Sequence, residues 1–440
     1  MKKYTKGLNL YKKASKIIPG GVQLLSKKPE IYLPDLWPSY YVSAKGSEII
    51  TLDNKKLFDF TNCSVGMCPL GYSNQYVNKA VVDVIKKGNI STLNSYLEIK
   101  CAKVILNLHK WAHMARFTKS GGEAVSVAVR IARSYTKKDK VLFCGYHGWH
   151  DWYISANLKD KNKLNKHLLP GISSSGIPKS LKNTSIPYEF NNIKDFEKKF
   201  LNNLKSLSCV ILEPARSNHP QMSFLKKIRY YCTKFNIPLI FDEITLGWHC
   251  ALGGYHKLKK INPDIAVFSK GTTNGYPLGV IIGKKKIMKA ANSSFISSAY
   301  WSENLGYAAA IATINYMKKN NVAKKLEKKG IKIKKIWEMA AKKYKVDLII
   351  NGVNSLPAFN FKNKNSSRIM TYFTQEMLAK GFLANGTCYV MLSHTDKLLS
   401  KYQNAFNKVF EKISKLQRRK IDFRKVLKGR EKFIKFKNPV

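Results

Sequence analysis

Short apolar runs separated by longer amphipathic stretches fill the middle of the chain, and this alternation restricts the fold more than any other feature. The runs are rich in Val, Ile, Leu and Phe, which is typical of strands buried on both faces of a sheet. The stretches between most of them are long enough for helical crossovers between parallel strands. We therefore predict an α/β domain with a mainly parallel sheet. The candidate strands are residues 140–144, 209–212, 239–241, 265–268 and 279–282.

The two ends of the chain predict a second, smaller module. Residues 47–53 have a strand-like pattern, and the chain beyond about residue 320 indicates a separate α+β part. A chain of 440 residues is long enough for one large and one smaller domain. In the large domain, alanine-rich amphipathic segments predict helices at residues 123–135 and 305–318. The expected division is residues 1–60 for the N-terminal part of the small domain, 61–319 for the large domain, 320–414 for the C-terminal part of the small domain and 415–440 for a basic tail.

The formal net charge of +51 raises the question of a nucleic-acid partner. The lysines, however, are scattered through almost every surface-type segment, and no zinc-finger, RNP-type or basic-zipper pattern accompanies them. Nucleic acid is therefore not an expected partner. A denser basic cluster lies between Arg418 and Lys437, where an acidic partner or a membrane surface could bind. A solvated tail is the expected interpretation of that cluster.

No stretch reaches the roughly 18 consecutive apolar residues of a membrane span. The basic N-terminus is not followed by the apolar segment of a secretory signal. Eight cysteines occur without a CxxC pair or regular spacing, so we expect free thiols, no disulfide framework and no metal site. These patterns predict a cytoplasmic protein that does not bind membranes.

Asp242 and Lys270 each follow a candidate strand and lie 28 positions apart (270 − 242). Ligands of open α/β sheets bind at the carboxyl ends of the strands, where both residues fall. A lysine that forms a Schiff base and an aspartate that keeps a pyridine nitrogen protonated are what pyridoxal 5′-phosphate (PLP) requires. Lys270 would also be the base that moves the substrate proton. Taken singly, Asp242 could be an N-cap or an ion-pair partner, and Lys270 one more surface lysine.

Two further segments suit the same cofactor. Ser120-Gly121-Gly122-Glu123 predicts a helix start, where backbone N–H groups and the helix dipole favour a phosphate. The loop from Gly145 to Asp151 offers Tyr146 as a residue that could stack on a planar ring. Alone, the first segment favours an ordinary serine N-cap with turn glycines, and the second favours an aromatic loop that packs on its own domain.

In its order of segments the chain resembles the class III aminotransferases of the fold-type-I PLP superfamily, and within them the glutamate-1-semialdehyde aminomutase-like branch. The resemblance extends from about Pro19 to Thr395. It implies helices on both faces of a mainly parallel central sheet and a smaller α+β domain built from the two chain ends. The segments that carry it are Phe117-Thr118-Lys119-Ser120-Gly121-Gly122-Glu123-Ala124, Tyr146-His147-Gly148, Glu213-Pro214, Phe241-Asp242-Glu243-Ile244, Ser269-Lys270-Gly271, Asn274-Gly275-Tyr276-Pro277-Leu278-Gly279 and residues 297–313.

The resemblance implies a role for each site residue. Lys270 would bind PLP covalently and Asp242 would pair with its pyridine nitrogen, and both are expected to be catalytic. Tyr146 and Ile244 would lie on opposite faces of the ring, and Asn218 would face the substrate. The family is dimeric, so we expect a homodimer in which each active site is completed by the neighbouring subunit. The implied cofactor-binding residues are Ser120, Gly121, Gly122, Tyr146, His147, Asp242, Ile244, Lys270 and Ser298.

Two departures from the family pattern concern the cofactor phosphate. The phosphate loop of the family usually reads Ser-Gly-Thr-Glu, and here Gly122 replaces the threonine. The neighbouring subunit normally lends a threonine to the phosphate, and here Ala299 takes that place. Ser298 could compensate for the second loss. Both changes predict a weaker hold on the phosphate.

Other departures concern the substrate. The aminomutase has an arginine after its N-terminal Pro-Gly-Gly-Val segment, where this chain offers Lys27, a point charge instead of a bidentate fork. The aminomutase also has an acidic residue late in the chain, whereas Asn385-Gly386-Thr387-Cys388-Tyr389 has none. Trp37, in Leu33-Pro34-Asp35-Leu36-Trp37-Pro38, adds an aromatic wall that suits a bulkier substrate. Lys27, Trp37 and Asn218 are the expected substrate-binding residues.

We therefore predict a PLP-dependent aminotransferase that moves an amino group from an amino acid donor to a carbonyl-containing biosynthetic intermediate, for example a keto-sugar, by a ping-pong mechanism. The alternative within enzymes is the aminomutase itself, which exchanges the group internally and needs no separate donor. The non-enzyme alternatives are a basic nucleic-acid-binding protein and a cofactor-free scaffold.

Overall fold

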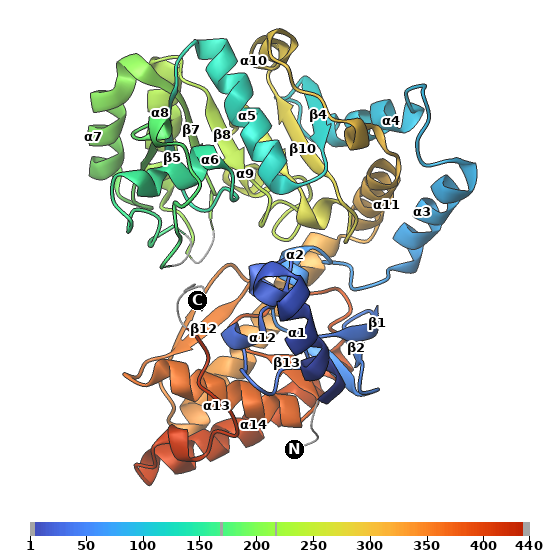
Figure 1. Cartoon of the computed structure of the whole chain (residues 1–440), viewed down its shortest axis with the longest axis vertical. Coiled ribbons are helices and arrows are strands. Elements are labelled where there is room, and N and C mark those ends of the chain that lie inside the picture. Colours follow the sequence, from blue (N-terminus) through green and yellow to red (C-terminus); the bar gives the residue numbers. More distant parts are fainter. Residues whose placement is uncertain (1–4, 168–169, 216–217, 434–440) are drawn as a thin grey trace. The chain divides into compact units, whose positions relative to one another are not determined.

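The computed structural model describes residues 5–167, 170–215 and 218–433, which form two compact units (Figure 1). The first unit comprises residues 5–74 and 324–433, and the second unit comprises residues 75–323. Both ends of the chain therefore contribute to the first unit. No helix in the described ranges is long and apolar enough to cross a membrane. The cysteines are free thiols, as the sequence predicts.

The second unit is built around a seven-stranded sheet with the order β4-β10-β9-β8-β7-β5-β6. Neighbouring strands from β9 to β6 run parallel, whereas β10 is antiparallel to both β9 and β4. The prediction of a mainly parallel sheet is confirmed. Its strands are β4 (Met114–Thr118), β5 (Lys140–Cys144), β6 (Ser185–Pro187), β7 (Leu207–Leu212), β8 (Leu239–Asp242), β9 (Ile265–Phe268) and β10 (Gly279–Gly283).

Alternate residues of these strands face two separate apolar cores, so helices cover both faces of the sheet, as the sequence predicts. On one face, Phe143 and Ile211 pack with α5. On the other, Leu142 and Leu212 pack with α7 and α8. The helices are α3 (Gln75–Lys87), α4 (Tyr96–Leu106), α5 (Gly121–Thr136), α6 (Asp151–Ile154), α7 (Ile193–Asn203), α8 (Met222–Lys234), α9 (Tyr255–Lys259), α10 (Lys285–Met288) and α11 (Leu305–Lys319).

The first unit combines a four-stranded mixed sheet, in the order β1-β2-β3-β13, with helices from both ends of the chain. Strand β13 pairs in parallel with β3 and so joins the C-terminal part to the N-terminal part, as the sequence predicts. Its strands are β1 (Tyr41–Lys45), β2 (Glu48–Thr51), β3 (Lys56–Phe60), β11 (Leu348–Asn351), β12 (Ala358–Phe361) and β13 (Phe382–Ala384). Its helices are α1 (Thr5–Ile17), α2 (Cys63–Gly66), α12 (Val322–Tyr344), α13 (Ser366–Ala379) and α14 (Asp396–Arg418).

The basic C-terminal residues up to Phe433 pack against the first unit. Arg430 donates to both carboxylate oxygens of Asp35, over 3.0 and 2.7 Å. The backbone N–H of Phe433 donates to the Glu30 carbonyl over 2.8 Å. These contacts hold the segment to the loop that also carries Trp37.

His394 provides a pH-dependent contribution to the stability of the first unit. Its Nε2 lies 2.8 Å from the Asp59 carbonyl oxygen, and its Nδ1 accepts from the Met391 N–H over 3.2 Å. A neutral imidazole protonated on Nε2 satisfies both contacts. Complete burial lowers the pKa of His394 from 6.5 to about 4.

The first testable prediction is therefore a loss of stability in acid that depends on His394. Below pH 6.5 His394 is protonated in the unfolded chain but stays neutral in the folded protein. The free energy of unfolding therefore falls as the pH drops towards 4. We expect roughly 2 kcal/mol of the loss in unfolding free energy between pH 7 and pH 5 to come from this residue. Urea unfolding of the wild type and of His394→Gln at both pH values measures that share. An equal loss in both proteins would contradict the assignment.

Candidate active site

Loops that follow several strands of the second unit meet at one edge of its sheet. Strands β5, β7, β8 and β9 run in one direction, and β4 shares it because β10 is antiparallel to both β4 and β9. The carboxyl ends of these strands therefore lie at the same edge. This edge carries Ser120 after β4, Tyr146 after β5, Asn218 after β7, Asp242 at the end of β8 and Lys270 after β9.

Asp242 is a buried carboxylate, 3% exposed, with both oxygens engaged. Its Oδ2 lies 2.8 Å from Nδ1 of His147, and its Oδ1 accepts from the Ile244 N–H over 3.1 Å. The other ring nitrogen of His147 lies 3.2 Å from the Cys144 carbonyl oxygen. Both ring nitrogens of His147 thus face oxygen atoms. The Asp242 side chain is thereby fixed at the end of its strand.

The adjacent Glu243 points to a different set of partners, as expected for neighbouring residues at the end of a strand. One carboxylate oxygen accepts from the backbone N–H of Tyr255 over 2.9 Å. The other accepts from the backbone N–H of His256 over 2.8 Å and lies 2.9 Å from Nδ1 of that ring. Glu243 thus fixes the start of α9 and anchors the peptide that follows Asp242.

Lys270 begins the turn after β9 with a left-handed backbone, φ 46°. Its Nζ donates to the hydroxyl of Thr245 over 2.9 Å. Thr245 lies three residues after Asp242, so the two residues singled out by the sequence meet the same short loop. Residues in this backbone region tend to persist where the surrounding structure fixes them, often at functional sites.

The N-terminus of α5 is the candidate phosphate site. The Ser120 hydroxyl accepts from the Glu123 N–H over 3.3 Å, and Glu123 accepts from the Ser120 N–H over 2.8 Å, which forms a capping box. A Cβ built on Gly121 would lie 2.8 Å from Cδ1 of Ile244, so the Ile244 side chain already covers that position. Small residues are therefore required where Ile244 meets the helix start.

His150 is a site residue that the sequence did not reveal. A Cβ built on Gly122 would lie 2.9 Å from Cε1 and 3.1 Å from Nδ1 of His150, so the imidazole occupies the space of a side chain at position 122. The Trp149 ring stacks on His150 at 4.4 Å between centroids. The His150 Nδ1 is buried and has no hydrogen-bond partner in the described part of the chain. Burial lowers the pKa of His150, which favours the neutral ring.

Tyr146 lies in the same loop and is fixed through its backbone. Its N–H donates to Glu213 over 2.8 Å, and its ring contacts Tyr153 edge-on at 6.0 Å between centroids. Glu213 also limits position 145, because a Cβ on Gly145 would lie 2.8 Å from its Oε2. Glu213 and Gly145 thus orient the residue that the sequence places on the ring face opposite Ile244.

Trp301 and Glu303 pack on the candidate phosphate loop of their own chain. Lys119 forms an ion pair with Glu303, and Nε1 of Trp301 donates to Glu123 over 3.4 Å. Burial against this partner lowers the pKa of Lys119, with Glu303 opposing the shift. Ser298 itself is exposed in this segment, and its expected contact with a neighbouring subunit's phosphate stays a prediction.

The three expected substrate residues fall in different places. Asn218 is exposed and lines a cavity of about 360 Å³ together with Gly145 and Glu213. Lys27 and Trp37 belong to the first unit, where Lys27 is exposed and Trp37 is only 8% exposed. The Trp37 ring stacks on Tyr32 at 4.5 Å between centroids. Their roles towards a substrate stay predictions.

Comparisons with known proteins identify the family of the chain and its fold. The family model described as aminotransferase class-III matches residues 35–415. A 3-aminobutyryl-CoA aminotransferase of Cloacimonas acidaminovorans (strain Evry) is 27% identical over 429 residues, which cover 94% of this chain and 99% of the relative. A glutamate-1-semialdehyde 2,1-aminomutase of Wigglesworthia glossinidia brevipalpis is 31% identical over 428 residues, covering 91% and 97%.

A solved structure shows the same fold. The FumI protein of Sphingopyxis sp. MTA144, described as its PLP internal aldimine form, superposes with a TM-score of 0.86. The match covers 96% of this chain and 100% of that one at 21% sequence identity.

Proposed function

The chain belongs to the class III aminotransferases, which makes it a PLP-dependent enzyme of the aminotransferase and aminomutase type. We propose that, within this family, it transfers an amino group from an amino acid donor to a separate carbonyl acceptor. The observation that carries the separate acceptor is Lys27 in place of the aminomutase arginine, whereas the convergence of Asp242, Lys270 and the start of α5 at one edge of the sheet supports the PLP chemistry. Family membership favours an enzyme over a nucleic-acid-binding protein or a cofactor-free scaffold.

The residues at this edge fit PLP. A buried carboxylate suits the protonated pyridine nitrogen, a lysine suits the aldehyde, and an open helix start suits the phosphate. At Gly121 and Gly122 the space that a Cβ would need is filled by Ile244 and His150, so a larger residue at either position would have to displace those side chains. When bound, PLP supplies the electron sink and carries the amino group between the two halves of a ping-pong reaction.

In the proposed mechanism Asp242 stabilises the protonated pyridine nitrogen, and His147 orients Asp242. Asp242 would hold the pyridine N–H of bound PLP and keep its proton in place, because a buried carboxylate is stabilised by hydrogen-bond donors. His147 donates to Oδ2 and prevents Asp242 from turning away. The Ile244 N–H does the same at Oδ1.

Lys270 transfers the substrate proton, and Thr245 positions the Lys270 side chain. A neutral Lys270 amine takes that proton at Nζ and returns it at a different carbon. The Thr245 hydroxyl, 2.9 Å away, fixes the position of Nζ when the amine is free. A side chain with four rotatable bonds is thereby limited to one region of the site.

We assign to His150 the phosphate-binding role of the family's threonine, whose position is occupied here by Gly122. Its buried Nδ1 has no partner in the described structure and lies beside the first turn of α5, so a phosphate at that turn would satisfy it. The histidine and the glycine thus form a pair, because a threonine at position 122 would collide with the ring. This exchange explains how the chain holds a phosphate without the family's threonine.

The second testable prediction follows from this pair. His150→Ala is expected to weaken PLP binding to the apoenzyme by about tenfold, the effect of one lost hydrogen bond to a charged group. Gly122→Thr alone should weaken it too, because of the collision, whereas Gly122→Thr with His150→Ala should recover most of the affinity. Titration with PLP, together with the ³¹P chemical shift of the bound phosphate, measures this. Additive losses in the double variant would contradict the exchange.

A separate acceptor distinguishes this proposal from internal exchange. The chain offers Lys27 where the aminomutase has an arginine, and no carboxylate at residues 385–389. We therefore expect glutamate 1-semialdehyde alone to be isomerised slowly or not at all, even when PLP is bound to Lys270. Product analysis of that reaction tests the point. Rapid isomerisation without an amino donor would establish the aminomutase instead.

A homodimer completes the proposal. Large apolar side chains are exposed beside a groove of about 690 Å³ formed by α3, residues 88–97 and α11. Leu93 is 82% exposed and Tyr96 is 70% exposed, which is unfavourable unless another surface covers them. A second copy is the occupant that the family resemblance implies, with the exposed Ser298 as the residue expected to serve the neighbour's phosphate site.

The third testable prediction concerns this assembly. Sedimentation equilibrium is expected to give twice the chain mass of 50.1 kDa. Leu93→Glu should shift the population towards the monomer. Leu258→Glu is the matched control, because Leu258 is also an exposed apolar residue but lies outside the groove. A monomeric wild type would contradict the shared active site.

The free thiols of all eight cysteines favour a reducing compartment, and we place the enzyme in the cytoplasm.

A further inference from the structure

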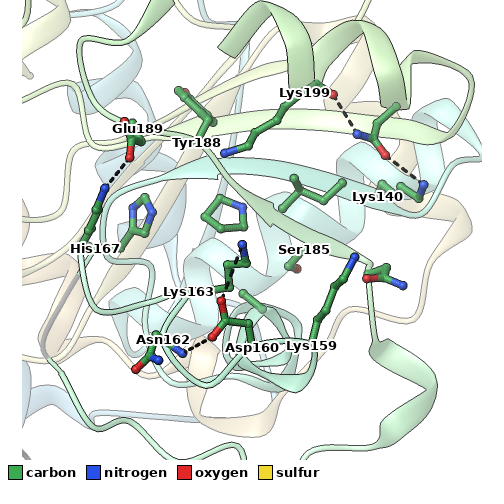
Figure 2. Close-up of a pocket in the computed structure, with 16 residues that line it drawn as sticks. Lys140, Lys159, Asp160, Asn162, Lys163, His167, Ser185, Tyr188, Glu189 and Lys199 are labelled. Carbon is green, nitrogen blue, oxygen red and sulfur yellow. Dashed lines mark hydrogen bonds and ion pairs between the residues drawn. The ribbon is translucent and has the colours of Figure 1, made fainter. Parts of the chain in front are cut away.

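A lysine-rich cavity of about 580 Å³ lies along β6, at the edge of the second unit's sheet (Figure 2). One wall is the segment of residues 159–167, and another is α7. In Figure 2, Lys159 and Lys163 enter the cavity from the first wall and Lys199 from the second. The lysines that line it are Lys140, Lys159, Lys163, Lys166 and Lys199.

The acidic groups around the cavity do not balance these lysines. Lys163 pairs with Asp160 at 3.8 Å, Lys166 with Glu189 at 2.5 Å, and Lys199 with Asp195 at 2.8 Å. Five lysines against three carboxylates leave an excess of two positive charges (5 − 3). Lys140 donates only to the neutral Asn203 amide oxygen, over 3.0 Å. The cavity therefore has ammonium groups available for an anion.

This cavity adjoins a second, smaller cavity beside the loop that carries Tyr146. The smaller cavity that contains Asn218, Gly145 and Glu213 shares Lys166, His167 and Glu189 with it. The Gly145 N–H donates to Nδ1 of His167 over 3.2 Å, which joins the shared wall to the Tyr146 loop. Burial lowers the pKa of His167 to about 4, so this ring is neutral and accepts that bond. The two cavities thus share a wall that is bonded to the loop carrying Tyr146.

We propose that the carbonyl acceptor bears a phosphate or diphosphate group, which binds among these lysines while the carbonyl reaches Lys270. The inference rests on the proposed amino transfer and deepens it by naming the class of acceptor. Ammonium groups are strong donors to phosphate oxygens, and a cavity of about 580 Å³ is in the size range of small-molecule sites.

Binding of inorganic pyrophosphate to the PLP-loaded enzyme tests the anion site directly, because the cofactor phosphate then occupies the start of α5. We expect Lys159→Ala with Lys163→Ala to weaken pyrophosphate binding by about tenfold. Lys161→Ala with Lys179→Ala is the matched control, since these exposed lysines line neither cavity but remove the same charge. No binding to the wild type, or equal weakening in both variants, would overturn the proposal.

Acceptor kinetics connect the anion site to the reaction. Dihydroxyacetone, fructose and ribulose are each compared with their monophosphates as acceptors for enzyme that has first reacted with an amino donor. We expect at least one phosphorylated member to have a kcat/KM about tenfold higher than its partner, and the lysine-cavity variant to lose that advantage. Equal reactivity within every pair, or an advantage that survives in the variant, would overturn the inference. Failure of the donor reaction itself would count against the proposed function instead, and the pyrophosphate titration would still report on the cavity.

Discussion

Lys270→Ala is expected to lower the rate of amino transfer by at least about 10³-fold, the scale of losing both a covalent catalyst and a proton-transfer base. Lys270 is placed by the end of β9 and held by the Thr245 hydroxyl at 2.9 Å, so the substitution removes the amine from that position. Borohydride treatment of the wild type followed by peptide mass analysis should show the added cofactor mass on Lys270. The variant should show none at that position.

The control for this prediction is Lys260→Ala. Lys260 also has a left-handed backbone, with φ 51° against 46° for Lys270, so both variants remove a lysine from a similar conformation. Lys260 follows α9 and lies away from the carboxyl edge of the sheet strands. We expect it to retain wild-type activity. Full activity of Lys270→Ala, or equal losses in both variants, would contradict the lysine assignment.

Asp242→Asn is expected to lower kcat for the donor half-reaction by about 10²- to 10³-fold. Asparagine keeps the size of the side chain and can still accept from the Ile244 N–H. It removes the negative charge that holds a proton on the pyridine nitrogen, and it leaves His147 without its carboxylate partner. Stopped-flow absorbance of the cofactor after addition of an amino donor measures the rate.

Glu243→Gln is the matched comparison, since it alters the neighbouring buried carboxylate by the same chemical change. Glu243 accepts from the N–H groups of Tyr255 and His256, so its substitution should lower the free energy of unfolding and have a smaller effect on the donor rate. Asp242→Asn should do the reverse. A pair of variants with the opposite distribution of effects would contradict the roles given to the two carboxylates.

The central strands were predictable because burial on both faces leaves a continuous apolar run, as in β7 and β9. Strands β4 and β6 escaped prediction for opposite reasons. In β4, Arg116 interrupts a half-buried run, and β6 is a three-residue edge strand that ends in Pro187. The pairing of β13 with β3 joins distant parts of the chain, and no local pattern specifies such a contact.

The candidate site was predictable where chemistry coincides with a strand end. Asp242 and Lys270 meet that condition, and the capping pattern of Ser120 and Glu123 marks the start of α5. His150 and Thr245 could not be identified, because their significance lies in contacts with Gly122 and Lys270 that depend on loop conformation. The lysines of the cavity were indistinguishable from other lysines in a chain with a net charge of +51.

Single-turnover transfer of ¹⁵N tests the central claim most directly. PLP-loaded enzyme is mixed with ¹⁵N-labelled glutamate or alanine, freed of donor, and then offered carbonyl acceptors. We predict release of one oxo acid per active site, a change in the cofactor absorbance, and recovery of that absorbance as ¹⁵N appears in the acceptor. No oxo acid from any amino donor, with PLP demonstrably bound to Lys270, would contradict the account.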